Sequence, residues 1–117
     1  MLAQKNRIHG RRTFVVTLKK GRVVRGQYFN INYSDNNAGR LKAAVVVSKK
    51  ISKSAVVRNR LRRRLYEILR KNFLTKLGNK NLIIIVFNPD IINLKSAELE
   101  NLISNLISKI KDNDFSS

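Results

Sequence analysis

The spacing of apolar residues predicts one long helix in the middle of the chain. Over residues 54–77, apolar side chains recur every three or four positions, which places them on one stripe of an amphipathic helix. Ser54 is of a residue type that caps helix N-termini, and Gly78 is of the type that ends helices. The stripe consists of Val57, Leu61, Leu65, Ile68, Leu69 and Phe73.

Two further segments show helical spacing. Residues 95–111 place leucine and isoleucine at three- and four-residue steps between polar residues, and they predict a second amphipathic helix. Residues 11–21 are ambiguous, because Phe14 and Leu18 lie four positions apart, whereas the β-branched residues between them favour a strand. Taken alone, this segment is interpreted as a short helix that Gly21 ends.

Three segments have the pattern of β-strands. Residues 23–33 end in alternating apolar and polar positions, as in a half-buried strand, and residues 41–48 predict a second, more buried strand. Residues 34–39, which lie between them, are turn formers, so we expect the two strands to pair as an antiparallel hairpin. Residues 81–89 are apolar almost throughout and predict a central strand that is covered on both faces.

This series of elements predicts an α+β fold. We expect a two-layer α/β sandwich in the order α-β-β-β-α-β-α, with the helices packed over one sheet. The 117 residues suffice for a single domain, residues 1–117, with one hydrophobic core. Within it, residues 1–10 are expected to form a basic N-terminal tail and residues 112–117 to fray.

The net charge of +18 points to a polyanionic partner. The chain has 25 Lys and Arg against seven Asp and Glu, and residues 1–88 hold 22 of the basic residues but only two acids. Residues 89–117, by contrast, carry a net charge of −2. Because self-repulsion of this size opposes a compact state, a bound polyanion is the natural reason for it, and nucleic acid is favoured over an anionic membrane surface.

Composition also excludes several classes of protein. The sequence has no cysteine, so disulfides and cysteine-based metal sites are excluded. Its longest apolar run, residues 82–87, falls far short of the roughly 20 residues that span a membrane, and residues 1–12 lack the apolar stretch of a secretory signal. We therefore expect a cytoplasmic protein with no membrane partner.

Five arginines lie between Arg58 and Arg64 on the long helix. On a helical wheel, Arg60, Arg63 and Arg64 point away from the apolar stripe, whereas Arg58 and Arg62 flank it. A charged helix face is usually only solvated. Here, however, acids are almost absent and the cations occupy the positive end of the helix dipole, at a cost of about 0.3–1 kcal/mol each. We interpret the arginines as a binding site for nucleic-acid phosphates.

The basic residues around this cluster have a distinctive spacing. The sequence runs Ser48-Lys49-Lys50, then Ala55-Val56-Val57-Arg58-Asn59-Arg60, then Arg62-Arg63. This block resembles the signature of the protein component of bacterial ribonuclease P, and the similarity extends over roughly residues 5–110. The chain departs from that family at Lys53-Ser54, where Gly-Asn is common, at Leu18, where an aromatic residue is common, and at Asn88, where a basic residue is usual.

That resemblance implies a role in tRNA processing. It implies a ribonucleoprotein endonuclease, a hydrolase that removes the 5′ leader of precursor tRNA, in which the RNA subunit and its bound magnesium ions carry out catalysis. The expected partners are the catalytic RNA subunit and precursor tRNA, with no protein partner required. The implied fold resembles the second domain of a small-subunit ribosomal protein and has a left-handed βαβ crossover, although about 98% of such crossovers are right-handed.

The resemblance also implies two binding surfaces. Residues expected to bind the RNA subunit are Lys49, Lys50, Lys53, Arg58, Asn59, Arg60, Arg62 and Arg63. The leader-binding cleft, between the first helix and the sheet, is expected to contain Phe14, Leu18 and Phe29, with Ser48 and Lys49 at its edge. Aromatic stacking there is worth about 1–3 kcal/mol per base. The alternative for the three apolar residues is a core position, which we favour for Leu18.

The sequence offers no catalytic residue and no metal site of its own. Asp35, Glu67 and Asp90 stand far apart, so no carboxylate pair is placed to hold two metal ions, and His9 lies in the basic N-terminal segment. We therefore expect an accessory subunit that catalyses nothing alone. Two alternatives are an RNA-binding ribosomal or ribosome-assembly protein, and a nuclease that acts by itself, which the missing acids and histidines disfavour.

Overall fold

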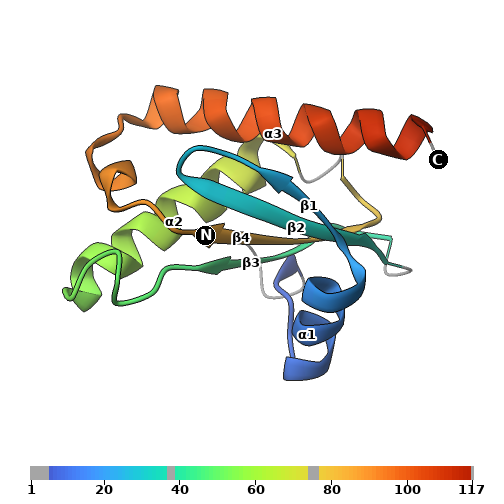
Figure 1. Ribbon diagram of the computed structural model, residues 1–117, viewed down its shortest axis with the longest axis horizontal. Helices are drawn as coiled ribbons and strands as arrows, with labels where there is room; N and C mark the ends of the chain where they lie inside the picture. Colours follow the sequence, from blue (N-terminus) through green and yellow to red (C-terminus); the bar gives the residue numbers. More distant parts are fainter. Residues whose placement is uncertain (1–5, 37–38, 74–76, 117) are drawn as a thin grey trace.

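Four strands form one sheet, with α-helices on both of its faces (Figure 1). The computed structural model describes the backbone of residues 6–36, 39–73 and 77–116, and the side chains of these ranges up to Ile110. The elements are α1 (Arg11–Lys20), β1 (Arg22–Arg25), β2 (Phe29–Asp35), β3 (Lys42–Val46), α2 (Ala55–Asn72), β4 (Lys80–Val86), a short 3-10 helix η2 (Pro89–Asn93) and α3 (Ser96–Ser116). The predicted α+β fold is confirmed, with α1 on the face opposite to α2 and α3.

The strand order in the sheet is β1-β2-β4-β3. β4 pairs antiparallel with β2 and parallel with β3, so the central position predicted for residues 81–89 is confirmed. The predicted hairpin between residues 23–33 and 41–48 is wrong, because β4 lies between these two segments. The antiparallel hairpin instead joins β1 to β2. Burial explains the difference, since Leu82, Ile83 and Ile84 are completely buried and need a neighbouring strand on each side and a layer on each face.

β3, α2 and β4 form a βαβ unit, because two parallel neighbouring strands are joined through a helix. The left hand of this crossover stays a prediction. The parallel pairing has a consequence for function: the carboxyl ends of β3 and β4 lie at the same edge of the sheet, where binding sites of α/β sheets often form. Residues 47–54, which lead from β3 into α2, therefore begin at this edge.

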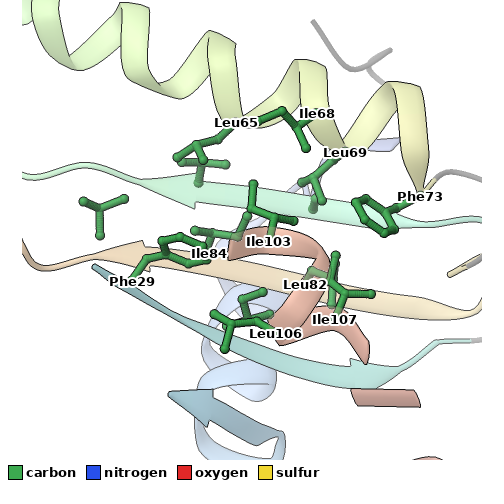
Figure 2. Packing of buried hydrophobic residues seen from close by; sticks show 14 of the residues in the cluster. Phe29, Leu65, Ile68, Leu69, Phe73, Leu82, Ile84, Ile103, Leu106 and Ile107 are labelled. Atoms are coloured by element: carbon green, nitrogen blue, oxygen red, sulfur yellow. The ribbon is translucent and has the colours of Figure 1, made fainter. Parts of the chain in front are cut away.

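The hydrophobic core lies between one face of the sheet and the helices α2 and α3 (Figure 2). The side chains of Phe29, Ile31 and Tyr33 alternate along β2 and point into it, opposite Val86, Ile84 and Leu82 of β4. The apolar stripe predicted for the long helix is buried against this face at Leu61, Leu65, Ile68, Leu69 and Phe73. α3 contributes Leu99, Ile103, Leu106, Ile107 and Ile110.

The ends of the helices follow the sequence in part. Ser54 is the N-cap of α2, as predicted, and its Oγ accepts a hydrogen bond from the Val57 amide at 3.3 Å. α2 ends at Asn72, before the predicted residue 77, and Leu77 is buried in the turn that precedes β4. α3 continues to Ser116, so its backbone is helical over most of residues 112–117, and residue 117 lies outside the described residues.

Gly21 ends α1 for a steric reason. Its φ of −76° is open to any residue, so a left-handed conformation is not the requirement. A Cβ atom at this position would lie 2.3 Å from the Thr17 carbonyl oxygen and 2.5 Å from the Tyr33 carbonyl oxygen. Both neighbours are backbone atoms, which cannot move aside without shifting α1 from β2.

We expect Gly21→Ala to lower the free energy of unfolding by about 1–3 kcal/mol, as overpacking of a close contact does. The measurement is the urea midpoint at constant denaturant slope, which reports a change in stability alone. An unchanged midpoint would show that α1 separates from β2 without cost.

Candidate nucleic-acid interface

Residues 47–54 form a basic loop between β3 and α2. Lys49, Lys50 and Lys53 are all exposed on it, and no described residue hydrogen-bonds to or pairs with their side chains. Ile51 anchors the loop, because its side chain is only 5% exposed and its amide donates to the Ser48 carbonyl at 3.1 Å. The loop thus presents three ammonium groups to solvent from a fixed backbone.

Arg58 holds the end of this basic loop. Its Nη1 donates to the carbonyl oxygens of Ser52 at 2.9 Å and of Lys53 at 3.0 Å. The rest of the guanidinium group keeps free donors, because arginine carries five N–H groups. Arg58 therefore ties the first turn of α2 to the loop, and a phosphate contact can use only the part of the group that remains.

Arg62 lies one helical turn further along the same side of α2. Its Nη1 is 3.5 Å from the Val47 carbonyl oxygen, and its Nη2 hydrogen-bonds to the Oδ1 of Asn59. Val47 immediately follows β3, so Arg62 contacts the backbone at the outer edge of that strand. Arg58, Asn59 and Arg62 thus spend part of their hydrogen-bonding capacity inside the protein.

The outer edge of β3 is closed by side chains and by the N-terminal segment. Tyr66 of α2 accepts a hydrogen bond from the Val45 amide at 3.1 Å, and the Ile8 amide donates to the Ala43 carbonyl at 3.0 Å. The Asn6 Nδ2 donates to the Leu41 carbonyl at 2.8 Å. This part of the predicted basic tail is therefore packed, and an edge strand that would otherwise offer unpaired backbone groups is covered.

Arg60 and Arg63 differ from the other arginines of the cluster. Both are exposed, and neither makes a hydrogen bond or an ion pair with a described residue. Arg64, by contrast, is half-buried, and its Nη2 donates to the Leu94 carbonyl at 2.6 Å. α2 has no acidic residue in its first turn, and Glu67, the nearest acid to Arg63 on this helix, is paired with Arg70. Arg60 and Arg63 are the two arginines best placed to contact an external phosphate.

An ion pair near the C-terminal end of α2 shows what a local acid does to an arginine. The Arg70 Nε donates to Glu67 Oε1 at 3.1 Å, and the Arg70 Nη2 binds the same oxygen. This hydrogen bonding lowers the pKa of Glu67 from 4.5 to about 2 and raises the pKa of Arg70. Because the folded-state pKa of Glu67 is depressed, the pair stabilises the fold above pH 4.5, and this stabilisation is lost as the pH falls through about 2.

We expect Arg70→Ala to raise the pKa of Glu67 towards 4.5, since the hydrogen bond from Arg70 is the largest cause of its depression. A side-chain NMR titration of Glu67 measures this shift directly. Lys71→Ala is the matched control, because it removes one neighbouring cation that forms no hydrogen bond or ion pair with a described residue. A Glu67 pKa that moves equally in both variants would contradict a specific pair.

The other candidate surface is the side of the sheet that faces α1. Phe14 and Leu18 are half-buried on α1, and Thr17 between them is buried, with its Oγ1 3.4 Å from the Ser34 Oγ of β2. These residues therefore turn towards the sheet while Phe14 and Leu18 keep part of their surface in solvent. Neither Phe14 nor Leu18 belongs to the core cluster between the sheet, α2 and α3.

Phe29 requires a correction. It is 1% exposed and packs with Ile84 and Ile103 on the face that α2 and α3 cover (Figure 2). It therefore does not share a surface with Phe14 and Leu18, and of the two readings that the sequence left open for Phe29, the core position is the one observed. Ser48 and Lys49 are exposed just beyond β3, at the carboxyl edge of the sheet.

The α1 face of the sheet is occupied by residues that were not predicted from the sequence. Asn30 and Asn32 alternate with the buried Phe29, Ile31 and Tyr33, so they point to the opposite face, and the pairing register puts Ile85 and Ile83 beside them. The period-two pattern of this strand already placed the asparagines on the face opposite to the apolar residues. Phe87, 49% exposed just after β4, was also missed.

Comparison with known proteins identifies the family. The sequence model of the family described as Ribonuclease P matches residues 2–111. The chain belongs to the ribonuclease P protein family. The "Ribonuclease P protein component" of Pseudanabaena sp. is 33% identical over 112 residues, which cover 95% of this chain and 96% of that protein. The protein component of Thermus scotoductus is 40% identical over 82 residues, 70% of this chain, and the matched stretch spans 46% of that longer protein.

Solved ribonuclease P proteins share the fold. The Staphylococcus aureus RNase P protein superposes with a TM-score of 0.76 at 23% identity, over 91% of this chain and 95% of that one. The RNase P protein from Thermotoga maritima gives a TM-score of 0.77 at 23% identity, over 88% of this chain and 96% of that one. At this identity the likeness establishes the α+β architecture, and the family assignment comes from the sequence matches.

Two features of the described residues bear on other functions. No helix in that part of the chain is both long and apolar enough to cross a bilayer. The described residues also contain no group of three or more histidine, aspartate or glutamate side chains that could hold a metal ion. The residues of this ribonuclease P family member thus provide basic and apolar surfaces in the described ranges, and no acidic cluster.

Proposed function

We propose that this chain is the protein subunit of ribonuclease P, a ribonucleoprotein endonuclease, and that it binds the catalytic RNA subunit and the 5′ leader of precursor tRNA to aid removal of the leader. The observation that carries this proposal is the exposed basic cluster at the carboxyl end of β3, in a chain of this family. It consists of Lys49, Lys50, Lys53, Arg60 and Arg63.

In this proposal the basic loop and the first turns of α2 bind phosphates of the RNA subunit. Arg60 and Arg63 carry the strongest contacts, because planar guanidinium groups bind phosphate oxygens bidentately and these two have no partner among the described residues. Arg58 and Arg62 bind backbone carbonyls of the loop, Asn59 binds Arg62, and all three offer the phosphates only their remaining hydrogen-bonding groups. The position of the three lysines thus depends on an internal arginine contact.

The leader is proposed to lie on the α1 face of the sheet. The exposed parts of Phe14 and Leu18 provide an apolar surface on which single-stranded bases can stack, whatever their sequence, and Ser48 and Lys49 lie at its edge for a backbone phosphate. Asn30 and Asn32 add uncharged donors and acceptors on the same face of the sheet. A leader recognised by stacking and backbone contacts suits a subunit that handles many precursor tRNAs.

Catalysis is assigned to the RNA subunit. Magnesium ions, which would bind through that RNA, would stabilise the attacking and leaving oxygens of phosphodiester hydrolysis. The described residues of this chain do not fit such a role, since they offer no cluster of acids or histidines. The protein contributes positive charge and position, as an accessory subunit that works where precursor tRNA is made, in the cytoplasm.

Leader binding has a direct test. In complex with a bacterial ribonuclease P RNA, the protein should increase the affinity for precursor tRNA and leave the affinity for mature tRNA, which lacks the leader, nearly unchanged. Titration of both tRNAs with and without the protein measures this difference. An equal gain for both tRNAs would show that the protein acts on the RNA subunit alone.

A further inference from the structure

A second basic site lies on the other side of α2 from the basic loop. A cavity of about 460 Å³ opens between α2 and the segment that joins η2 to α3. We call it the α2–α3 pocket, and its lining residues are Val57, Arg60, Leu61, Arg64, Ile92, Lys95 and Ser96. Its size is in the range of pockets that hold small-molecule ligands.

The lining of the α2–α3 pocket combines two kinds of chemistry. Arg60, Arg64 and Lys95 are cationic, and no acidic side chain lines the pocket. Leu61 is buried, and Val57 and Ile92 are half-buried, so they provide an apolar floor. A ligand that fits both must carry a negative charge beside a flat or apolar body, and a nucleotide has this combination.

The cations are placed differently within the pocket. The Arg64 guanidinium is fixed by its hydrogen bond to the Leu94 carbonyl at 2.6 Å, which leaves its other donors for a ligand. Arg60, one turn earlier on the same side, is exposed and has no partner among the described residues. The backbone amide of Lys95 already donates to Glu98 Oε1 at 3.2 Å, so the side chains, and not the start of α3, form the site.

We propose that the α2–α3 pocket binds one unstacked nucleotide of an RNA strand, with its phosphate on the three cations and its base against the apolar floor. The proposal rests on the proposed function, because it makes this pocket a second contact with the RNA subunit. Arg60 then stands between two contacts, with the basic loop on one side of α2 and the pocket on the other. The RNA would be bound along both flanks of the helix.

The test compares three single variants of the full-length protein in binding to a bacterial ribonuclease P RNA over a range of salt concentrations. Lys95→Ala should weaken binding and reduce the salt slope by about 0.7–0.9, the value for one lost phosphate contact. Ile92→Ala should weaken binding by about 5-fold or more with an unchanged slope, because it removes apolar contact area and no charge. Lys109→Ala, which removes one exposed lysine from α3 outside the pocket, should change neither.

An NMR titration with adenosine 5′-monophosphate locates the site independently. The backbone amide signals that shift should cluster at residues 57–64 and 92–96, and Lys95→Ala should reduce the shifts while Lys109→Ala leaves them. Equal signal shifts in the two lysine variants, or shifts spread evenly over the basic surface, would contradict nucleotide binding in the pocket. That result is distinct from failure of the proposed function, in which the unmodified protein does not bind the RNA subunit.

Discussion

Replacing Arg60 and Arg63 together with alanine is expected to weaken binding to the ribonuclease P RNA by about 10- to 100-fold, because charge-assisted contacts to phosphate are worth on the order of 1 kcal/mol or more each. The same variant should reduce the slope of log affinity against log salt by about 1.4–1.8, the sum for two lost phosphate contacts. Its thermal stability should be unchanged or slightly higher, since neither arginine has an internal partner among the described residues.

The matched control removes two cations from the other end of the same helix. Arg70 and Lys71 are both exposed, and Arg70 is already paired with Glu67. Their double alanine variant should keep most of the affinity for the RNA and most of the slope of log affinity against log salt. If it loses as much as the Arg60 and Arg63 variant, then net charge and not a defined site binds the RNA.

A third double variant tests whether Arg58 and Arg62 hold the basic loop in place or contact the RNA directly. Arg58→Ala with Arg62→Ala removes the hydrogen bonds to the carbonyls of residues 47, 52 and 53, so it should lower the melting temperature as well as RNA affinity. A variant that binds more weakly at unchanged stability would place Arg58 and Arg62 among the direct RNA contacts.

Phe29→Ala is expected to destabilise the protein by about 3–5 kcal/mol, the usual cost of removing a completely buried phenylalanine. That cost is a large share of the total stability of a domain, so the folded fraction of the variant should fall at physiological temperature. Phe14→Ala should cost far less, because Phe14 is only half-buried and lies outside the core cluster. Urea unfolding of the two variants measures the difference.

Leader affinity should follow the opposite order. Where both variants are folded, Phe14→Ala should lower the affinity for a single-stranded leader by the value of one stacked base, about 1–3 kcal/mol, and Phe29→Ala should leave it unchanged. Loss of leader affinity in folded Phe29→Ala, with none in Phe14→Ala, would place the leader on the other face of the sheet.

The helices and the central strand were predictable because each depends on one long periodic segment. Residues 54–77 carry six stripe residues, and residues 81–89 are apolar on both faces. Strand pairing was harder, because it depends on which segment most needs a neighbour on each side. If the three segments of strand pattern are taken as three strands, a central strand at residues 81–89 has to lie between the other two, and that arrangement excludes a direct hairpin between residues 23–33 and 41–48.

The candidate site was predictable as a region but not residue by residue. Charge and spacing located the arginine cluster, because five arginines with few acids near them are visible in the sequence. The division of those arginines depends in part on the backbone carbonyls of Val47 and Leu94, which are distant from their arginine partners in the sequence and come near α2 only in the fold. Alternation placed Phe29 and Asn30 on opposite faces of the strand, but which of these faces α1 covers depends on the fold.

The most direct test of the account is cleavage by a reconstituted enzyme. The protein is mixed with a bacterial ribonuclease P RNA and a precursor tRNA at a magnesium concentration too low for the RNA alone to be active. We predict that the unmodified protein restores removal of the 5′ leader and that the Arg60 and Arg63 double alanine variant restores it only at much higher protein concentration. No stimulation by the unmodified protein, although it is folded, would contradict the account.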